Sequence, residues 1–396
     1  MSEQTPLLWH SNAPWTSTGY GQQTGLFAPG INEHYRVGIS AFYGLEGNRL
    51  TWQGIPVYPG NSGDFGNKTL PPNAAMHFGS DLRDGLVVTL LDVWVLDPQI
   101  AQAFNMACWV PVDHEPPPAP VSTFLRQSLV VPLAMSRFGQ EQLTEFDPLY
   151  VPHGIDTEIY RPIDRAEARD TTKLPQEAFI VGLVAANKGN PSRKCFAESL
   201  LAFKRFRDEN PDAILYLHTE MTGRFQGVDM GKLIAGVGLP EGSVFIGDQD
   251  RILQSPLSPD AMAHFYSAFD VLLAPTAGEG FGLTVLEANA CGTPAIVTDF
   301  SAQTEVCGAG WHVGYTPYWT TQDSWQAHPD IDEICEALKE SHALPALERD
   351  EMSKQARVHA SAYDVKTVLH DYMLPALAEV ERRYEARSPK SLKAAA

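Results

Sequence analysis

Short apolar runs, each ending in Gly, Pro, Asp or Ser, recur along the first part of the chain, and several are followed by segments long enough for a helix. Runs of this length that end at turn residues are typical of buried β-strands. Strands that alternate with helices favour βαβ units and therefore a parallel sheet. The expected strands are Leu7–Ser11, Val37–Phe42, Leu86–Leu91, Cys108–Val112 and Leu129–Met135.

A second series of strands and helices follows the acidic, proline-flanked stretch 160–175. Apolar positions recur with helical spacing in three segments, which predicts amphipathic helices at Phe196–Glu209, Pro259–Ala268 and Leu283–Ala290. The expected strands of this series are Phe179–Ala185, Ala213–His218, Ser243–Ile246, Val271–Pro275 and Pro294–Thr298.

Two successive parallel α/β sheets predict two Rossmann-like domains that face each other across a cleft. We expect the first domain at 1–160, a hinge at 160–176 and the second domain at 176–364. The last long helical pattern, about 365–388, can close either domain and can pack back on the first. Residues 44–75 contain Gly and Pro throughout, which predicts a hairpin or a long loop.

Composition agrees with a folded α/β chain and narrows its partners. The 396 residues suffice for two or three domains, and 44% hydrophobic against 19% charged residues is globular composition. The formal net charge of −19 disfavours nucleic acid and anionic bilayers as general partners. No apolar run approaches the roughly 20 residues that a membrane-spanning helix needs, so we expect no transmembrane segment.

Cysteine usage and the first residues point to one compartment. The five cysteines are odd in number, widely spaced and without a CxxC pair, which indicates free thiols in a reducing environment. The opening sequence has no basic segment followed by an apolar core, so it does not look like a signal peptide. We therefore expect a cytoplasmic protein.

The most informative segment is a glycine-rich loop between a strand end and a helix start, 275–287. Gly278, Gly280 and Gly282 let the backbone approach a ligand closely, and the first amides of the following helix offer an anion site. Glu279 and Glu287 flank this site, and carboxylates accept hydrogen bonds from hydroxyl groups. A ligand with phosphate in its middle and hydroxyls at both ends fits, which describes a nucleotide sugar.

The sequence EGFGLTVLEANACGTPAIVTD resembles the Glu-x7-Glu signature of family 4 glycosyltransferases, which are retaining enzymes of the GT-B fold. The resemblance implies that Glu279 contacts the transferred sugar and that Glu287 holds the nucleotide ribose. It also implies that the backbone between them meets the diphosphate. The residues so implicated are Gly280, Phe281, Gly282, Leu283 and Thr284. The alternative is an ordinary strand–loop–helix segment with solvated glutamates.

The stretch Val181–Lys194 resembles the first strand and loop of the same family's C-terminal domain, the nucleotide-sugar-binding domain. The resemblance assigns neutralisation of the donor diphosphate to Arg193 and Lys194. Two adjacent bases before a helix oppose its dipole, so an anion between them is a more economical reading than a solvated helix start. Lys188 is the alternative base.

Two N-terminal stretches resemble the acceptor-binding domain of that family. Gly19 and Gly21 follow the first strand, where the resemblance implies contact with the donor phosphates; a plain turn is the alternative. At the end of a later strand, His114 is the candidate catalytic residue for the sugar, with Asp113 nearly as good. The alternative there is a loop cluster that stabilises the proline-rich turn.

Five further features lie outside these motifs, and most have structural interpretations. Ser136 is expected to end a strand or cap a helix, Arg137 is a candidate cleft base, and His153 is expected to be structural. Gly247 stands where family 4 enzymes approach the nucleotide base. The DxD pattern at 248–250 superficially offers a metal motif, but its context favours exposed turn carboxylates, so we expect no metal site.

The resemblance implies a retaining glycosyltransferase that moves a sugar from a nucleoside diphosphate sugar, such as a UDP- or GDP-sugar, to an acceptor hydroxyl. Front-side displacement is the mechanism usually proposed for such enzymes, with the leaving diphosphate stabilised by Arg193, Lys194 and helix amides. No cofactor and no protein nucleophile are expected. A GT-B nucleotide-sugar epimerase and a non-catalytic binding module are the alternatives, and the sequence names no acceptor.

Overall fold

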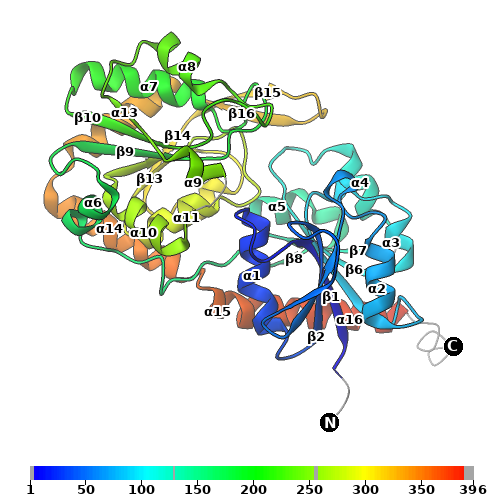
Figure 1. Cartoon of the computed structure of the whole chain (residues 1–396). Helices are drawn as coiled ribbons and strands as arrows, with labels where there is room; N and C mark the ends of the chain where they lie inside the picture. Colours follow the sequence, from blue (N-terminus) through cyan, green and yellow to red (C-terminus); the bar gives the residue numbers. More distant parts are fainter. Residues whose placement is uncertain (1–3, 128–129, 254–256, 388–396) are drawn as a thin grey trace. The chain divides into compact units, whose positions relative to one another are not determined.

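The computed structural model describes residues 4–127, 130–253 and 257–387, and the chain divides into two compact units. The N-terminal unit comprises Met1–Gly154, Gln322–Ser324 and Val365–Ala396, and the C-terminal unit comprises Ile155–Thr321 and Trp325–Asp364. Each unit is built around its own central sheet (Figure 1).

The N-terminal unit contains an eight-stranded sheet in the order β3-β4-β2-β1-β5-β6-β7-β8, counted over its described residues. All neighbouring strands are parallel except β3 and β4, which form an antiparallel pair. The strands β1 to β8 are Pro6–Asn12, Arg36–Tyr43, Leu50–Trp52, Ile55–Pro59, Leu86–Leu90, Asn105–Val110, Val130–Ala134 and Leu149–Tyr150.

Helices cover both faces of this sheet, which is why strands such as β5 are buried along their whole length. On one face α2, α3 and α4 contribute to a common apolar core with β5 and β6. The other face carries α1 and the C-terminal helical segment, where Tyr384 exchanges hydrogen bonds with the backbone of Met106. The helices are α1 Gly19–Ile31, α2 Leu70–Phe78, α3 Ile100–Ala103, α4 Ala119–Leu125, α5 Arg137–Gln142, α15 Val365–Val368, a π-helical turn Leu369–Met373 and α16 Leu374–Arg387.

The C-terminal unit contains a six-stranded parallel sheet in the order β11-β10-β9-β12-β13-β14 and a separate antiparallel hairpin, β15–β16, within its described residues. Strand β9 lies beside β10 and β12, so the chain crosses over at this point of the sheet. The strands β9 to β16 are Phe179–Val184, Ala213–His218, Val244–Ile246, Val271–Leu273, Ala295–Thr298, Gly310–Val313, Tyr315–Trp319 and Trp325–Pro329.

Helices α7, α8 and α13 lie on one side of the second sheet, and α6, α10, α11 and α14 lie on the other (Figure 1). The aromatic face of α7 enters the core because Phe196, Phe203 and Phe206 recur with helical spacing. The helices are α6 Arg165–Thr172, α7 Phe196–Glu209, α8 Met230–Val237, α9 Gln249–Leu253, α10 Pro259–Ala268, α11 Leu283–Ala290, α12 Gln303–Val306, α13 Ile331–Ala343 and α14 Ala346–Ser361.

The expected hinge at 160–176 is wrong. This stretch contains α6 and belongs to the C-terminal unit, whose boundary with the N-terminal unit falls between Gly154 and Ile155. Arg169 of α6 is buried and donates to the carboxylate of Asp270, 2.8 Å away, so α6 is bound to the second sheet. The helical segment that begins at Val365, which the sequence left open, is part of the N-terminal unit.

Residues 44–75 contain more order than a long loop. The expected hairpin exists as β3–β4, but β4 also pairs in parallel with β2 and so extends the main sheet. Helix α2 then begins at Leu70. Two predicted elements reach beyond the described residues, because Leu129 and residue 388 lie outside them. No helix within the described ranges is both long and apolar enough to cross a bilayer.

Candidate active site

The glycine-rich loop lies at the carboxyl end of β12 and leads directly into α11. Gly282 is the residue before the helix and has φ +113°, a backbone conformation that favours glycine. The amides of Leu283 and Thr284 belong to the first turn, where a helix supplies no backbone acceptor. The predicted anion-binding geometry is therefore present at this helix start.

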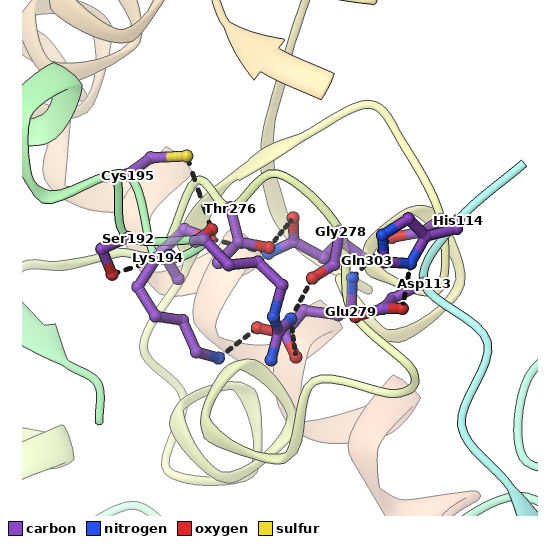
Figure 2. Close-up of polar contacts among 12 residues, drawn as sticks. Asp113, His114, Ser192, Lys194, Cys195, Thr276, Gly278, Glu279 and Gln303 are labelled. Carbon is purple, nitrogen blue, oxygen red and sulfur yellow. Dashed lines mark hydrogen bonds and ion pairs between the residues drawn. The ribbon is translucent and has the colours of Figure 1, made fainter. Parts of the chain in front are cut away.

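Glu279 is held between the two predicted phosphate-binding bases. Its Oε2 lies 3.2 Å from Nη1 of Arg193, and its Oε1 forms an ion pair with Lys194 (Figure 2). The Glu279 side chain is only 12% exposed. Burial would raise the pKa of Glu279, but the charges of Arg193 and Lys194 outweigh it and hold that pKa below its usual range.

The loop that carries Arg193 and Lys194 is bound to the glycine-rich loop by backbone contacts as well. The amide of Ala277 donates to the carbonyl of Arg193 at 2.8 Å, and the Arg193 guanidinium donates to the carbonyl of Gly278. A small cavity beside them is lined by residues of both loops and of the neighbouring strands, including Leu183, Lys194, Thr276, Glu279, Thr284 and Gln303. The structure thus places Arg193 and Lys194 beside the glycine-rich loop and Thr284, and their role at a diphosphate stays a prediction.

Glu287 lies on α11 and is almost fully buried. Its Oε2 accepts a hydrogen bond from the hydroxyl of Tyr266, at 2.8 Å. Burial, and then the charge of Glu287, raise the pKa of Tyr266 well above its ordinary value, so the phenol remains a donor at neutral pH. The alternative that both motif glutamates are simply solvated is wrong, because Glu287 is buried, Glu279 is only 12% exposed, and both are paired.

The remaining C-terminal candidates are less closely connected to this cluster. Lys188, the alternative base, is exposed. Gly247 donates to the carbonyl of Leu217 at 2.8 Å, immediately after β11. Asp248 accepts from the amides of Asp250 and Arg251 at 3.0 and 3.2 Å, which is helix capping. Across the described part of the chain, no cluster of three metal-ligand side chains occurs.

The N-terminal glycines have different environments. Gly21 is buried at the start of α1. A Cβ atom at this position would lie 2.0 Å from Oγ1 of Thr16 and 2.7 Å from the carbonyl oxygen of Thr16. Its amide donates to Oγ1 of Thr18, the capping residue, at 3.1 Å. Gly19 is the first residue of α1 and is exposed. Close packing therefore explains Gly21, and the phosphate role of both glycines stays a prediction.

Asp113 and His114 form a pair at the end of β6. Oδ1 of Asp113 lies 2.6 Å from Nδ1 of His114 (Figure 2). Because a carboxylate only accepts, this contact places the proton on Nδ1 and leaves Nε2 as the acceptor in the neutral ring. His114 is buried. The two candidates that the sequence could not separate thus act as one unit, in which Asp113 orients the imidazole.

Ser136 and His153 were expected to be structural, and Arg137 was a candidate cleft base. Ser136 caps α5 by accepting from the amide of Gly139 at 3.0 Å, as expected. His153 packs against the indole of Trp109 with 4.4 Å between ring centroids, and burial lowers its pKa to about 3, which confirms a structural position. Arg137 lies over the ring of Tyr150, 3.6 Å from its centroid.

Sequence reasoning missed three residues that hold the site. Tyr266 orients Glu287, and Ser301 accepts from the amide of Glu279 at 2.9 Å. Gln303 donates to the carbonyl of Ala274 and accepts from the hydroxyl of Thr276, at 2.6 and 3.1 Å. Ser301 and Gln303 follow β13, a strand next to β12, so their place at the same sheet edge was the available signal.

Comparison with known proteins identifies the region that contains this site. Residues 193–340 match the family model described as Glycosyl transferases group 1. The lipopolysaccharide core biosynthesis mannosyltransferase LpsB of Rhizobium meliloti is 31% identical over 161 residues, 40% of this chain and 42% of that protein. A D-inositol 3-phosphate glycosyltransferase of Acidothermus cellulolyticus is 30% identical over 159 residues, 37% of this chain and 32% of that protein. The chain thus matches less than half the length of each of these two relatives.

Solved structures resemble the whole chain at low sequence identity. Sucrose-phosphate synthase from Thermosynechococcus elongatus aligns with a TM-score of 0.72 and 17% identity, over 97% of this chain and 100% of that chain. Anabaena HepE in complex with UDP-glucose aligns with a TM-score of 0.68 and 14% identity, over 94% of this chain and 99% of that chain. These similarities confirm the predicted fold class, GT-B with two Rossmann-like units.

Proposed function

Because residues 193–340 match the model of the group 1 glycosyltransferases, as the family 4 motif predicts, we propose that this chain is a retaining glycosyltransferase. It moves a sugar from a nucleoside diphosphate sugar to an acceptor hydroxyl. The family match and the named relatives support the transfer of a sugar. The retaining outcome and the donor class rest on the motif and on the site.

The single observation that carries the proposal is the cluster of Arg193, Lys194 and Glu279 beside the first turn of α11. Two cations and unbonded helix amides stabilise a diphosphate, whose negative charge grows as the bond to the sugar breaks. A carboxylate in the same cluster accepts hydrogen bonds from sugar hydroxyls. This combination fits a nucleotide sugar better than an inorganic anion, which needs no hydroxyl acceptor.

In the proposed reaction the bond between the anomeric carbon and the diphosphate oxygen breaks, and the acceptor oxygen bonds to that carbon on the same face. The departing diphosphate oxygen takes the proton of the acceptor hydroxyl. Arg193 and Lys194 hold the charge of the departing diphosphate. Glu279 faces the migrating sugar, whose ring gains positive charge in the transition state, and its ionised carboxylate stabilises that charge. No protein nucleophile takes part.

Glu287 holds the donor ribose in this proposal. Its carboxylate is fixed by the Tyr266 hydroxyl at one oxygen, and it accepts ribose hydroxyls at the other. Gly247, Gly280 and Phe281 complete the donor site as the family resemblance implies. From the N-terminal unit, Gly19 and Gly21 would serve the phosphates and the Asp113–His114 pair the sugar.

The proposed donor is a UDP- or GDP-sugar, since a related fold has been solved with UDP-glucose bound. We propose a cytoplasmic enzyme that needs neither a cofactor nor a divalent metal, because the phosphate charge is met by Arg193, Lys194 and amides. Activity that EDTA abolishes and manganese restores would contradict the metal independence.

The experiment incubates the full chain with UDP-, GDP- and ADP-sugars and measures released nucleoside diphosphate and the recovered sugar. Release of nucleoside diphosphate supports sugar transfer to an acceptor or to water, provided that the release is slower in Arg193→Ala. An altered sugar without release would identify an epimerase. Binding without either change would identify a binding module, so each rival has its own signature.

A further inference from the structure

Four exposed aromatic side chains lie at the carboxyl ends of neighbouring strands in the N-terminal unit, and we call them the aromatic edge. Trp15 follows β1, Tyr43 ends β2, Phe65 follows β4 and Trp94 follows β5. These strands are adjacent and parallel, so their carboxyl ends share one edge of the sheet. Open α/β sheets bind their ligands at this edge.

Each ring of the aromatic edge leaves two fifths or more of its residue surface exposed to solvent. The exposed fractions are 44% for Trp15, 48% for Tyr43, 42% for Phe65 and 51% for Trp94. Single exposed apolar residues are ordinary on protein surfaces, but a group of large rings is typical of a recognition site.

The loops that carry the rings are bound to one another. Nε1 of Trp15 donates to the carbonyl of Gly44, next to Tyr43, at 2.8 Å. The ring of Phe42 lies 6.2 Å from that of Phe65. From the Phe65 loop, Nδ2 of Asn67 donates to the carbonyl of Val95 at 2.9 Å, beside Trp94. Contacts therefore join the loops that carry the four rings to one another.

Local backbone contacts hold Phe65 in place. Its φ is +53°, a left-handed conformation in which it ends the short 3-10 turn Ser62–Asp64 and its amide donates to the carbonyl of Ser62. Nε2 of the buried His10 lies 3.1 Å from the carbonyl of Phe65 and supports this conformation. The chain thus holds an exposed ring in a conformation that glycine would adopt more easily.

The charge of the same edge selects among ligand classes. The segments that follow β2, β4, β5 and β6 hold two basic residues, Arg49 and Lys68. They hold six acidic residues, Glu46, Asp64, Asp92, Asp97, Asp113 and Glu115. Two bases minus six acids leave a net charge of −4 with His neutral, which repels phosphorylated ligands and anionic lipid surfaces. Carboxylates instead accept hydrogen bonds from hydroxyls.

We propose that the aromatic edge binds a neutral saccharide as the acceptor, with the apolar faces of its rings against Phe65 and Trp94 and its hydroxyls donating to nearby carboxylates. Aromatic faces with a few placed polar acceptors suit a ligand whose ring is apolar on its faces and polar at its rim. The acceptor assignment rests on the proposed transferase function, whereas the saccharide site does not.

The test titrates the full chain with lactose, maltose and cellobiose, and with glucose 6-phosphate as the anionic comparison, by saturation-transfer NMR and calorimetry. Phe65→Gly removes the ring while relaxing the left-handed backbone, so its melting temperature should not fall. Trp94→Ala removes a second ring. Phe225→Ala is the matched control, because Phe225 is 49% exposed but lies in the C-terminal unit.

We expect at least one neutral disaccharide to bind saturably, and Phe65→Gly and Trp94→Ala each to weaken it about tenfold while Phe225→Ala does not. Binding that favours glucose 6-phosphate, or phosphatidylglycerol vesicles over phosphatidylcholine vesicles, would overturn the inference. So would the absence of saccharide binding, or ring variants that bind like the unsubstituted chain. Thermal shifts with UDP and GDP in the same samples distinguish failure of the saccharide site from failure of the proposed donor class. If a disaccharide binds through these rings but neither nucleotide shifts the melting temperature, the saccharide site stands and only the donor class is contradicted.

Discussion

The loops after β1 and β12 share one local pattern, a strand end, glycines and a helix start, but their surroundings differ. In the first loop the Gly21 amide is already bound to the Thr18 hydroxyl. In the second loop a largely buried carboxylate, Glu279, lies between two cations beside a helix start that no side chain caps. The same backbone pattern therefore stands beside a side-chain cap in one unit and beside a cluster of charged side chains in the other.

The difference shows that glycine spacing alone identifies a site poorly. Glycine permits close approach in both loops, but at Gly21 the close neighbour is Thr16 of the same chain. What separates the two loops is charge: the segment 13–18 holds no charged residue, whereas the second loop faces Arg193 and Lys194. Variants at each loop can test this contrast.

The largest effect is expected for Arg193→Ala and Lys194→Ala. Each removes a cation whose interaction with the diphosphate strengthens toward the transition state, so kcat for nucleoside diphosphate release should fall about 10²–10³-fold. Steady-state kinetics with the preferred donor provides the measurement. Lys188→Ala is the matched control, because Lys188 is exposed and should change kcat less than about twofold. If kcat fell as far in Lys188→Ala as in Arg193→Ala, the assignment of the phosphate site to Arg193 and Lys194 would be contradicted.

A smaller effect is expected for Tyr266→Phe, which deletes the hydroxyl that donates to Glu287. Losing one hydrogen bond of about 0.5–1.5 kcal/mol loosens the ribose acceptor and should raise the donor KM about 2–12-fold with little change in kcat. Glu287→Ala should raise the same KM further. An unchanged KM in both variants would remove Glu287 from the donor site.

The smallest effect is expected in the first loop. Thr18→Ala removes the side-chain cap of α1 and should lower the free energy of unfolding by about 1 kcal/mol. UDP or GDP affinity should stay the same within about twofold, because the hydroxyl serves the helix rather than the donor. Chemical denaturation measures the free energy of unfolding, and calorimetry measures the nucleotide affinity. A large loss of nucleotide affinity without loss of stability would show that the first loop also binds the nucleotide, and would contradict the contrast between the two loops.

The sequence predicted the elements whose signals are local. Helix α10 begins as expected because Ser258 caps it and Pro259 stands at its first position. Helix α11 is bounded by Gly282 and by the turn at Gly292, and both ends were readable from the motif. The charged cluster was predictable for the same reason, since Glu279, Arg193 and Lys194 each lie in a recognisable segment.

Interactions between distant segments could not be read in this way. The acidic, proline-flanked stretch 160–175 resembled a hinge, but the buried pair of Arg169 and Asp270 fixes it to the second sheet across 101 positions of sequence. Tyr266 precedes Glu287 by 21 positions and carries no motif. The hairpin β15–β16 was also missed, because Pro317 and a short polar turn weaken its strand pattern.

Nucleoside diphosphate binding to Glu279→Gln tests the central claim most directly. If Glu279 contacted only the transferred sugar, as the resemblance implies, neutralising it would leave such binding nearly intact. The structure changes that expectation, because the Glu279 carboxylate occupies Arg193 and Lys194 and competes with a diphosphate for them. Calorimetry with UDP and GDP on folded Glu279→Gln should therefore show affinity about tenfold higher than that of the unsubstituted chain, while donor turnover falls. Weaker nucleotide binding, or unchanged binding and turnover together, would contradict the assignment of this cluster to the diphosphate.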